Sequence, residues 1–276
     1  MSVLEAILLG LVQGLTEFLP VSSSGHLTIG KEILGIETEN LTFEVVVHAA
    51  TVLSTIVAFR KDILSLIMGL FKFKLNEETD YVIKICISMI PVFIIGIFFK
   101  DYVEAIFGSG LLVVGISLLV TSTLLFLTTV VKQGNSEITK GKALIIGIAQ
   151  AIAVLPGLSR SGATISTGLL LGVKKDLVAK FSFLMVLVPV LGEAFLELIS
   201  GDLAAASSGI SSMSLAAGFF AAFLSCLFAC KLTIALVKRA KQTGFAIYST
   251  LPGLISFGYL MFNYRLSGQK LSLFCI

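Results

Sequence analysis

The sequence predicts an all-α integral membrane protein with six transmembrane helices plus two re-entrant helical hairpins, arranged as an inverted-topology repeat. The first observation is composition: 56% of the 276 residues are hydrophobic, only 13% are charged, and the mean hydropathy is +1.02. The second is that two further apolar segments are interrupted by proline, glycine and serine, and match each other at a constant offset. A chain this apolar is excluded from the class of soluble domains.

Six segments are long enough to cross a bilayer, which takes roughly 20 apolar residues each. They run approximately over 41–59, 80–100, 109–131, 177–199, 213–237 and 244–264. When these segments are placed alternately, thirteen lysines and arginines fall on one face and four on the other. The positive-inside rule makes the richer face cytoplasmic, so we expect both termini outside.

The two remaining apolar segments, 3–34 and 141–173, are predicted to be re-entrant hairpins. In the first, a helix over 3–19 must end at Leu19, because Pro20 disfavours helical geometry in the preceding residue. The apolar piece that follows Ser24 has only about ten residues before the next charges, too few to cross a bilayer. Each hairpin is therefore expected to dip into the membrane and return to the same face.

The two halves of the chain match without a gap at an offset of 137 residues. The matching pairs are Gly10 and Gly147, Gln13 and Gln150, Ser22 and Ser159, Ser24 and Ser161, and Gly25 and Gly162. We interpret residues 1–133 and 138–266 as two repeats of a single membrane domain, 1–276, each with one hairpin and three spans. Three crossings invert the second copy, so the hairpins meet inside the bilayer. Chance similarity between two helix breaks is the alternative.

Hydroxyl groups cluster where each hairpin's second helix starts, in the runs QGLTEFLPVSSSGH (13–26) and PGLSRSGATIS (156–166). Serine is a preferred N-cap, and a helix N-terminus offers backbone N–H groups and a positive dipole end. Two such ends facing each other form a cradle for an anion, most simply phosphate or diphosphate. The serines concerned are Ser22, Ser23, Ser24, Ser159 and Ser161, and simple capping is their alternative role.

Charged and polar side chains in the same runs add chemistry to this cradle. Arg160 supplies a planar guanidinium suited to phosphate oxygens, and an arginine at this depth is costly without a function. Gln13 and Glu17, spaced i, i+4, offer oxygens for Mg²⁺ or Ca²⁺, although Glu17 could instead only pair with Arg160. His26 is a candidate base, acid or nucleophile, or merely a local hydrogen-bonding group. Glu44 and His48, again i, i+4, are candidates for contacts behind the site.

A lipid or small-anion transporter is the rival function, since transporters use inverted repeats and broken helices. On the fold alone, transport is slightly favoured. The combination of Glu17, Ser23 and His26 separates the two classes, because transport needs an anion site but neither a nucleophile nor a base.

The two polar runs closely resemble the signatures of the bacterial undecaprenyl-pyrophosphate phosphatase family, the bacitracin-resistance phosphatases. These signatures are E/Q-x-x-x-E and P-G-x-S-R-S-x-x-T, and both are matched in full. The segments TFEVV (42–46), FSFL (181–184) and FAIY (245–248) are also similar to family segments. The resemblance thus covers nearly the whole chain.

The resemblance implies hydrolysis of undecaprenyl diphosphate to undecaprenyl phosphate and inorganic phosphate, which recycles the carrier lipid for cell-wall peptidoglycan synthesis. It also implies a divalent cation and a site that opens outward from the bacterial inner (cytoplasmic) membrane. Carried over by position, the acidic motif falls on Gln13 and Glu17, the nucleophile on Ser23 and the essential histidine on His26. The phosphate-binding set falls on Ser159, Arg160, Ser161 and Thr164.

For the mechanism we expect Ser23, activated by His26, to attack the terminal phosphorus. Direct attack by His26 or by water stays open. The expected partners are a polyprenyl diphosphate lipid and the bilayer, with no nucleic acid, and a homodimer is an open alternative to a monomer.

Overall fold

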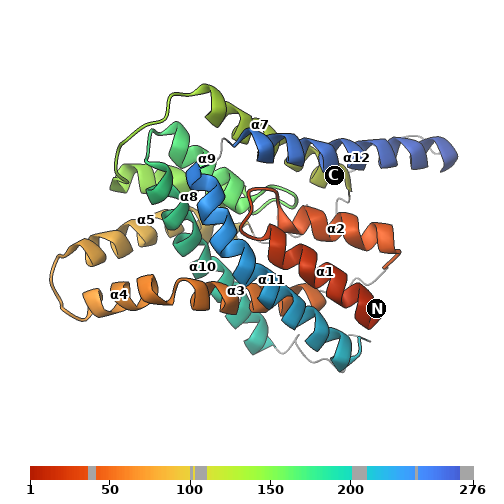
Figure 1. The fold of residues 1–276 in the computed structure, drawn as a ribbon, viewed down its shortest axis with the longest axis horizontal. Helices are drawn as coiled ribbons and strands as arrows, with labels where there is room; N and C mark the ends of the chain where they lie inside the picture. Colours follow the sequence, from red (N-terminus) through yellow and green to blue (C-terminus); the bar gives the residue numbers. More distant parts are fainter. Residues whose placement is uncertain (37–41, 100–101, 103–110, 201–209, 240–241, 268–276) are drawn as a thin grey trace.

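The computed structural model describes residues 1–36, 42–99, 102, 111–200, 210–239 and 242–267, and within these ranges it contains helices and no strands (Figure 1). The first half contains α1 (Val3–Thr16), α2 (Ser23–Leu34), α3 (Thr42–Ala58), α4 (Arg60–Leu70), α5 (Glu77–Phe98) and α7 (Leu111–Val130). The second half contains α8 (Lys140–Ile152), α9 (Arg160–Leu170), α10 (Lys175–Ser200), α11 (Ser212–Arg239) and α12 (Thr243–Ser267).

Each of the six segments predicted to span a membrane contains one long helix: α3, α5, α7, α10, α11 and α12. Helices α5, α7 and α11 are long and apolar enough to cross a bilayer by themselves. Helices α3 and α4 meet at a bend of 73° and make a fourth candidate if they form one span. The all-helical membrane class is therefore confirmed in its coarse form, with several apolar helices.

Both interrupted segments fold as a helix, a turn and a second helix. The first turn (residues 17–22) joins α1 to α2, and the second turn (residues 153–159) joins α8 to α9. The predicted end of the first helix at Leu19 is wrong, because α1 ends at Thr16 and the last helical hydrogen bond runs from Glu17 N–H to the Gln13 carbonyl. The helix ends there because Pro20 has no N–H to donate to the carbonyl of Thr16 and its ring clashes with that carbonyl. In the turn that follows, Phe18 packs edge-on against Phe183 of α10, with ring centroids 5.3 Å apart.

Helices at equivalent places in the two halves make equivalent contacts. Helix α1 packs on α11 and α8 packs on α5, while α3 packs on α11 and α10 packs on α5. Figure 1 shows α7 and α12 side by side along one edge. A Cβ atom on Gly10 of α1 would lie 2.4 Å from the carbonyl oxygen of Gly218, and one on Gly147 of α8 would lie 2.2 Å from that of Ser88. Glycine therefore permits each close approach of two backbones.

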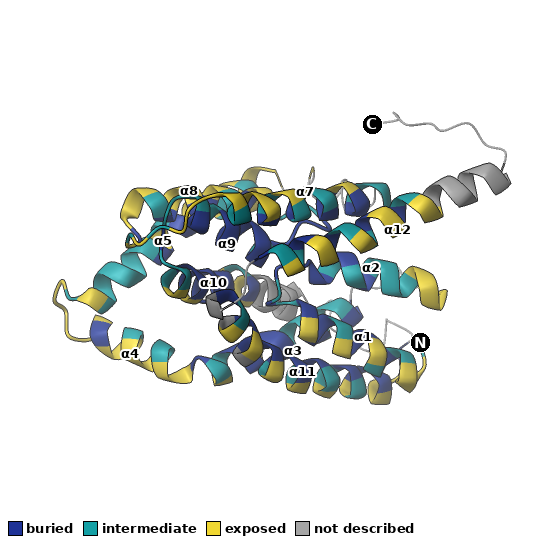
Figure 2. Ribbon diagram, turned by 45° about the horizontal axis from the view of Figure 1, so that its top comes forward, coloured by how far each residue is buried: buried dark blue, intermediate teal, exposed yellow. Residues whose placement is uncertain are grey.

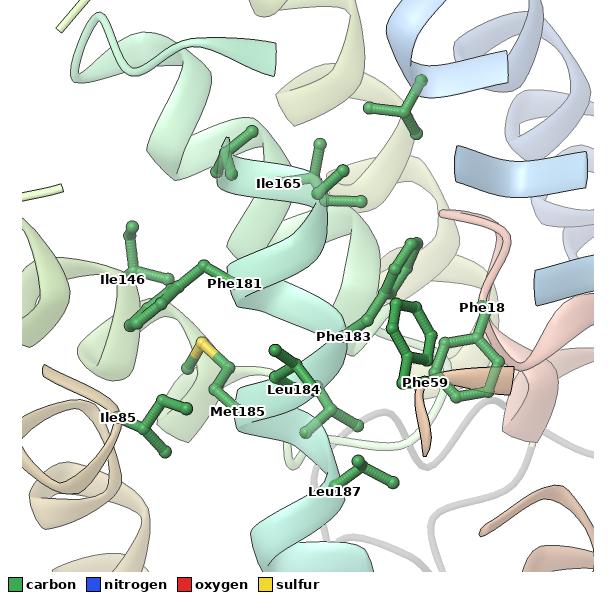
Figure 3. Close-up of a cluster of buried hydrophobic side chains, with 14 of the residues drawn as sticks. Phe18, Phe59, Ile85, Ile146, Ile165, Phe181, Phe183, Leu184, Met185 and Leu187 are labelled. Atoms are coloured by element: carbon green, nitrogen blue, oxygen red, sulfur yellow. The ribbon is translucent and has the colours of Figure 1, made fainter. Parts of the chain in front are cut away.

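The core lies around α10 and anchors the first turn. Figure 3 shows Phe18 and Phe59 against Phe183, and Met185 beside Ile85. Burial is concentrated along α9 and α10, whereas α4 carries many exposed positions (Figure 2). The apolar packing of Phe18 fixes the residue that directly follows Glu17, so the core sets the place of that carboxylate.

Candidate active site

The carboxylate of Glu17 is the centre of the polar cluster. Its side chain is only 5% exposed and it follows α1 directly. Oxygen Oε2 accepts hydrogen bonds from Gln13 Nε2 at 2.7 Å and from Ser23 Oγ at 2.6 Å, while Oε1 accepts one from Arg160 Nη2 at 3.2 Å. Because the arginine compensates the charge and the other donors satisfy the oxygens, a carboxylate can be buried here at a tolerable free-energy cost.

The two helix starts have the same local architecture. Ser22 caps α2 by accepting from Gly25 N–H at 3.3 Å, and Ser159 caps α9 by accepting from Gly162 N–H at 3.0 Å. Each cap hydroxyl also lies near the hydroxyl two residues on, at 3.3 Å for Ser22 with Ser24 and 3.2 Å for Ser159 with Ser161. Ser22 and Ser159 therefore cap their helices, and both lie in the turns that face each other.

The first residue of each half-helix carries the chemistry. Ser23 begins α2 and Arg160 begins α9, so the two residues occupy equivalent positions 137 residues apart. Both side chains bind Glu17. The same local structure in the two halves thus directs a hydroxyl from one half and a guanidinium from the other to one carboxylate.

Direct hydrogen bonds join the two turns. Ser161 Oγ donates to the carbonyl of Leu19 at 3.0 Å, and Gly157 N–H donates to Ser24 Oγ at 3.4 Å. Gly157 has a left-handed φ of 83° and its α-carbon lies against Val114 of α7, where a Cβ atom would come within 2.7 Å of backbone. The predicted meeting of the two runs is therefore confirmed as a contact between their turns.

His26 does not bond to Ser23, contrary to the expected activation of that serine. Its Nδ1 lies 2.7 Å from the carbonyl oxygen of Ser22, and its Nε2 lies 3.0 Å from the hydroxyl of Tyr248 on α12. The hydroxyl of Ser23 is instead directed to Glu17. The group that accepts the hydrogen bond of the serine is therefore the carboxylate of Glu17. The imidazole of His26, one helical turn after Ser22, is directed to α12 instead.

Thr164 lies in the second helix of its hairpin with its hydroxyl already used. Its Oγ1 donates to the carbonyl oxygens of Arg160 at 2.9 Å and Ser161 at 3.3 Å, and the residue is fully buried. It supports the first turn of α9. The expected direct role in holding phosphate is not visible in this geometry.

Two side chains from the spans stand behind the site. Of the two candidates for contacts behind the site, His48 lies near it, with Nε2 3.9 Å from Glu17 Oε2. Glu44 instead forms an ion pair with Lys31. Thr121 of α7 accepts a hydrogen bond from Ser159 N–H at 3.1 Å. Nothing in the sequence singles out Thr121, which is one of several hydroxyl residues in α7, and the sequence marked Tyr248 only as the last residue of the segment FAIY (245–248), without a role.

The oxygens near Glu17 fit a hard cation only in part. Gln13 Oε1 is buried and is one of several side-chain atoms without a hydrogen-bond partner, so its lone pairs are available to a cation. Among the described residues, however, no three or more His, Cys, Asp or Glu side chains are grouped to hold a metal. The donor set therefore suits Mg²⁺ or Ca²⁺ when phosphate oxygens complete the shell, as is usual for Mg²⁺.

A small cavity of about 10 Å³ borders Glu17, Thr51 and Thr55, with apolar residues such as Val186 completing its wall. A cavity of this size lies at the lower limit for holding one water molecule. The carboxylate thus borders room for a single water-sized guest.

The comparisons with known proteins agree with this geometry. Residues 6–255 match the family model described as Bacitracin resistance protein BacA. A Bacteroides fragilis protein named undecaprenyl-diphosphatase is 56% identical over 257 residues, covering 91% of this chain and 96% of its own. A relative of the same name from Parabacteroides distasonis is 56% identical, covering 93% of this chain and 97% of its own. Another from Carboxydothermus hydrogenoformans is 38% identical, covering 92% of this chain and 96% of its own. A match of this extent, with both polar runs inside it, shows that the chain belongs to the bacitracin resistance protein BacA family.

Proposed function

We propose that this protein hydrolyses undecaprenyl diphosphate to undecaprenyl phosphate and inorganic phosphate. The observation that carries the proposal is the convergence of Ser23, Arg160 and Glu17, a nucleophile, an anion-binding fork and a base within hydrogen-bond reach. Relatives named undecaprenyl-diphosphatase support it. A transporter is not favoured, because anion transport has no use for a serine bonded to a carboxylate.

Binding of the diphosphate is assigned to the two turns. The guanidinium of Arg160 supplies two parallel N–H donors, and the first turns of α2 and α9 add backbone dipoles. Arg160 is 24% exposed, so it can reach both Glu17 and an incoming phosphate. The prenyl chain would remain among the apolar helices, which is where its burial is most favourable.

The chemical step begins with Ser23 Oγ. A bond forms from this oxygen to the terminal phosphorus while the bond from that phosphorus to the bridging oxygen breaks, and undecaprenyl phosphate leaves. The serine proton moves to Glu17 Oε2, 2.6 Å away. Glu17 passes this proton to the leaving undecaprenyl phosphate. Water then attacks the phosphoserine, its proton moves to the carboxylate of Glu17, and Glu17 returns that proton to Ser23 Oγ as inorganic phosphate departs. Attack by His26 is disfavoured because both of its ring nitrogens are engaged.

A divalent cation, Mg²⁺ or Ca²⁺, fits this scheme as an ion that the protein would bind together with the substrate. Gln13 Oε1 would hold it from the protein side with charge supplied by Glu17. Such an ion neutralises charge on phosphate oxygens when bound.

Phosphate release by the purified protein in detergent tests the function. Undecaprenyl diphosphate is the substrate, and Ser23→Ala should lower turnover at least about a thousandfold, since the nucleophile is removed. Ser65→Ala, on the exposed face of α4, is the matched control and should leave turnover unchanged. Rapid quench with substrate labelled in the terminal phosphate should give phosphoserine in the unaltered protein. A labelled histidine would contradict the serine route.

We further infer that the six long helices cross the bacterial inner membrane and that the two hairpins are re-entrant, with both termini and the mouth of the site outside. The exchange of equivalent contacts between the halves supports an inverted repeat. A membrane-impermeant thiol reagent added to intact spheroplasts should label Ser2→Cys but not Lys74→Cys, each compared with the unaltered chain. Light scattering in detergent distinguishes a homodimer from a monomer.

A further inference from the structure

Tyr248 reaches from α12 to His26 of α2 across the boundary between the two halves of the chain. Its hydroxyl oxygen lies 3.0 Å from His26 Nε2. The two rings are also stacked nearly in parallel, with centroids 5.5 Å apart and planes inclined by 6°. The hydrogen bond therefore holds the Nε2 edge of the imidazole, and the nearly parallel ring of Tyr248 lies close beside it, which restricts the orientation of the imidazole.

The opposite edge of the imidazole determines which nitrogen carries the proton. His26 Nδ1 lies 2.7 Å from the carbonyl oxygen of Ser22, and a carbonyl oxygen can only accept. The hydrogen of the neutral ring is thus on Nδ1, and Nε2 accepts from the hydroxyl of Tyr248. Neither nitrogen is directed to Ser23, so the ring acts on the backbone of the turn.

The backbone that His26 holds is strained. Ser22 has φ 69° and ψ 99°, in the region that non-glycine residues rarely adopt. Its carbonyl oxygen accepts two hydrogen bonds from His26, one from the backbone N–H at 3.2 Å and one from Nδ1 at 2.7 Å. Strained conformations persist only where the surroundings over-determine them. The peptide so held is the one that leads directly into Ser23.

We propose that Tyr248 is a positioning residue for the hydrolysis. It clamps His26, which fixes the carbonyl of Ser22 and thereby sets the hydroxyl of Ser23 against Glu17. The proposal rests on the proposed function for its kinetic consequence, whereas the clamp itself is a property of the resting protein.

Kinetics of the full-length Tyr248→Phe variant test the consequence. Phenylalanine keeps the aromatic ring beside His26 and removes only the hydroxyl, so kcat should fall about tenfold, in keeping with one lost hydrogen bond. KM should stay within about twofold because Arg160 and the helix ends that bind the diphosphate are untouched. A raised KM with unchanged kcat would overturn the proposal.

Tyr259→Phe is the matched control. Tyr259 is the second tyrosine that α12 directs to α2, where its hydroxyl donates to Glu32 Oε1 at 3.2 Å in an exposed position. Its loss should leave kcat within about twofold. Equal losses in the two variants would mean that α12 merely braces α2, which contradicts a specific clamp.

The two histidines of the chain allow the clamp to be observed directly. In protein labelled with ¹⁵N-histidine, the signals are those of His26 and His48, and a His26→Gln variant assigns them. Tyr248→Phe should shift the Nε2 signal of His26 and leave His48 in place, while Tyr259→Phe should shift neither. An unmoved His26 signal would sink the proposal even if kcat fell. If the unaltered protein releases no phosphate, the proposed function fails while this spectrum still decides the clamp.

Discussion

Ser23 and Arg160 occupy equivalent positions in the two halves of the chain, and their side chains bind the same carboxylate, Glu17. Each is the first residue of a half-helix that starts from a serine cap. The two halves share the backbone arrangement of a serine cap followed by a helix, but they differ in the residue at the first helical position. Here the variation puts a hydroxyl on one oxygen of Glu17 and a guanidinium on the other, an arrangement that neither half provides alone.

Arg160→Lys should lower kcat/KM by about a hundredfold. Lysine keeps the positive charge but replaces the planar fork with a point charge, so the paired donors to phosphate and the bond to Glu17 are not both preserved. Phosphate release in detergent measures the loss. Arg60→Lys at the start of α4, where the guanidinium bonds to the carbonyl of Val57, is the matched control and should be silent. Near-normal turnover of Arg160→Lys would remove the arginine from the mechanism.

Glu17→Gln should lower kcat by about a hundredfold or more. The amide is nearly the same size as the carboxylate but cannot take the proton of Ser23, and it leaves Arg160 without its anionic partner. The same assay measures kcat, and thermal unfolding of the same sample shows whether the protein is still folded. Glu5→Gln in the exposed cap of α1 is the control, with activity expected to be unchanged. If Glu17→Gln is folded and fully active, Glu17 is not the base.

Gly147→Ala should lower the thermal midpoint by several degrees. The added Cβ atom would lie 2.2 Å from the carbonyl oxygen of Ser88, which is backbone and cannot rotate away, and overpacking of this kind costs about 1–3 kcal/mol. Gly141→Ala on the same helix has nothing within 4 Å of its added atom. That control should be neutral or slightly stabilising, because alanine favours helix over glycine. An equal loss in both variants would mean that α8 does not depend on its close approach to α5.

Removal of divalent cations with a chelator should abolish phosphate release, and added Mg²⁺ or Ca²⁺ should restore it. Gln13→Ala should raise the cation concentration needed for half-maximal activity about tenfold, because it removes the buried oxygen that has no other partner. Gln242→Ala, which removes another buried amide without a partner, should leave the cation requirement unchanged. Full activity in the presence of chelator would exclude the cation from the reaction.

Much of the fold was predictable because the bilayer restricts the pattern that a sequence can carry. Apolar segments of fixed length gave the six long helices in their correct places. The break at Pro20 was also readable, since proline ends a helix by geometry. The end of α1 was misplaced by three residues, because the prediction considered only the residue before Pro20, whereas proline also disrupts the carbonyl four residues earlier, at Thr16. The packing of Phe18 against Phe183 could not be predicted, since no local rule contains that contact.

The sequence by itself determined the chemistry at hand: Ser23, Glu17 and Arg160 are marked as costly polar groups in an apolar chain. Only the tertiary structure decided how they are used. It directed Ser23 to Glu17 rather than to His26, and it placed Tyr248 on the imidazole. The reason is physical, because spacing along a helix says which residues share a face, whereas hydrogen-bond partners 143 and 222 residues apart are chosen by how the helices pack.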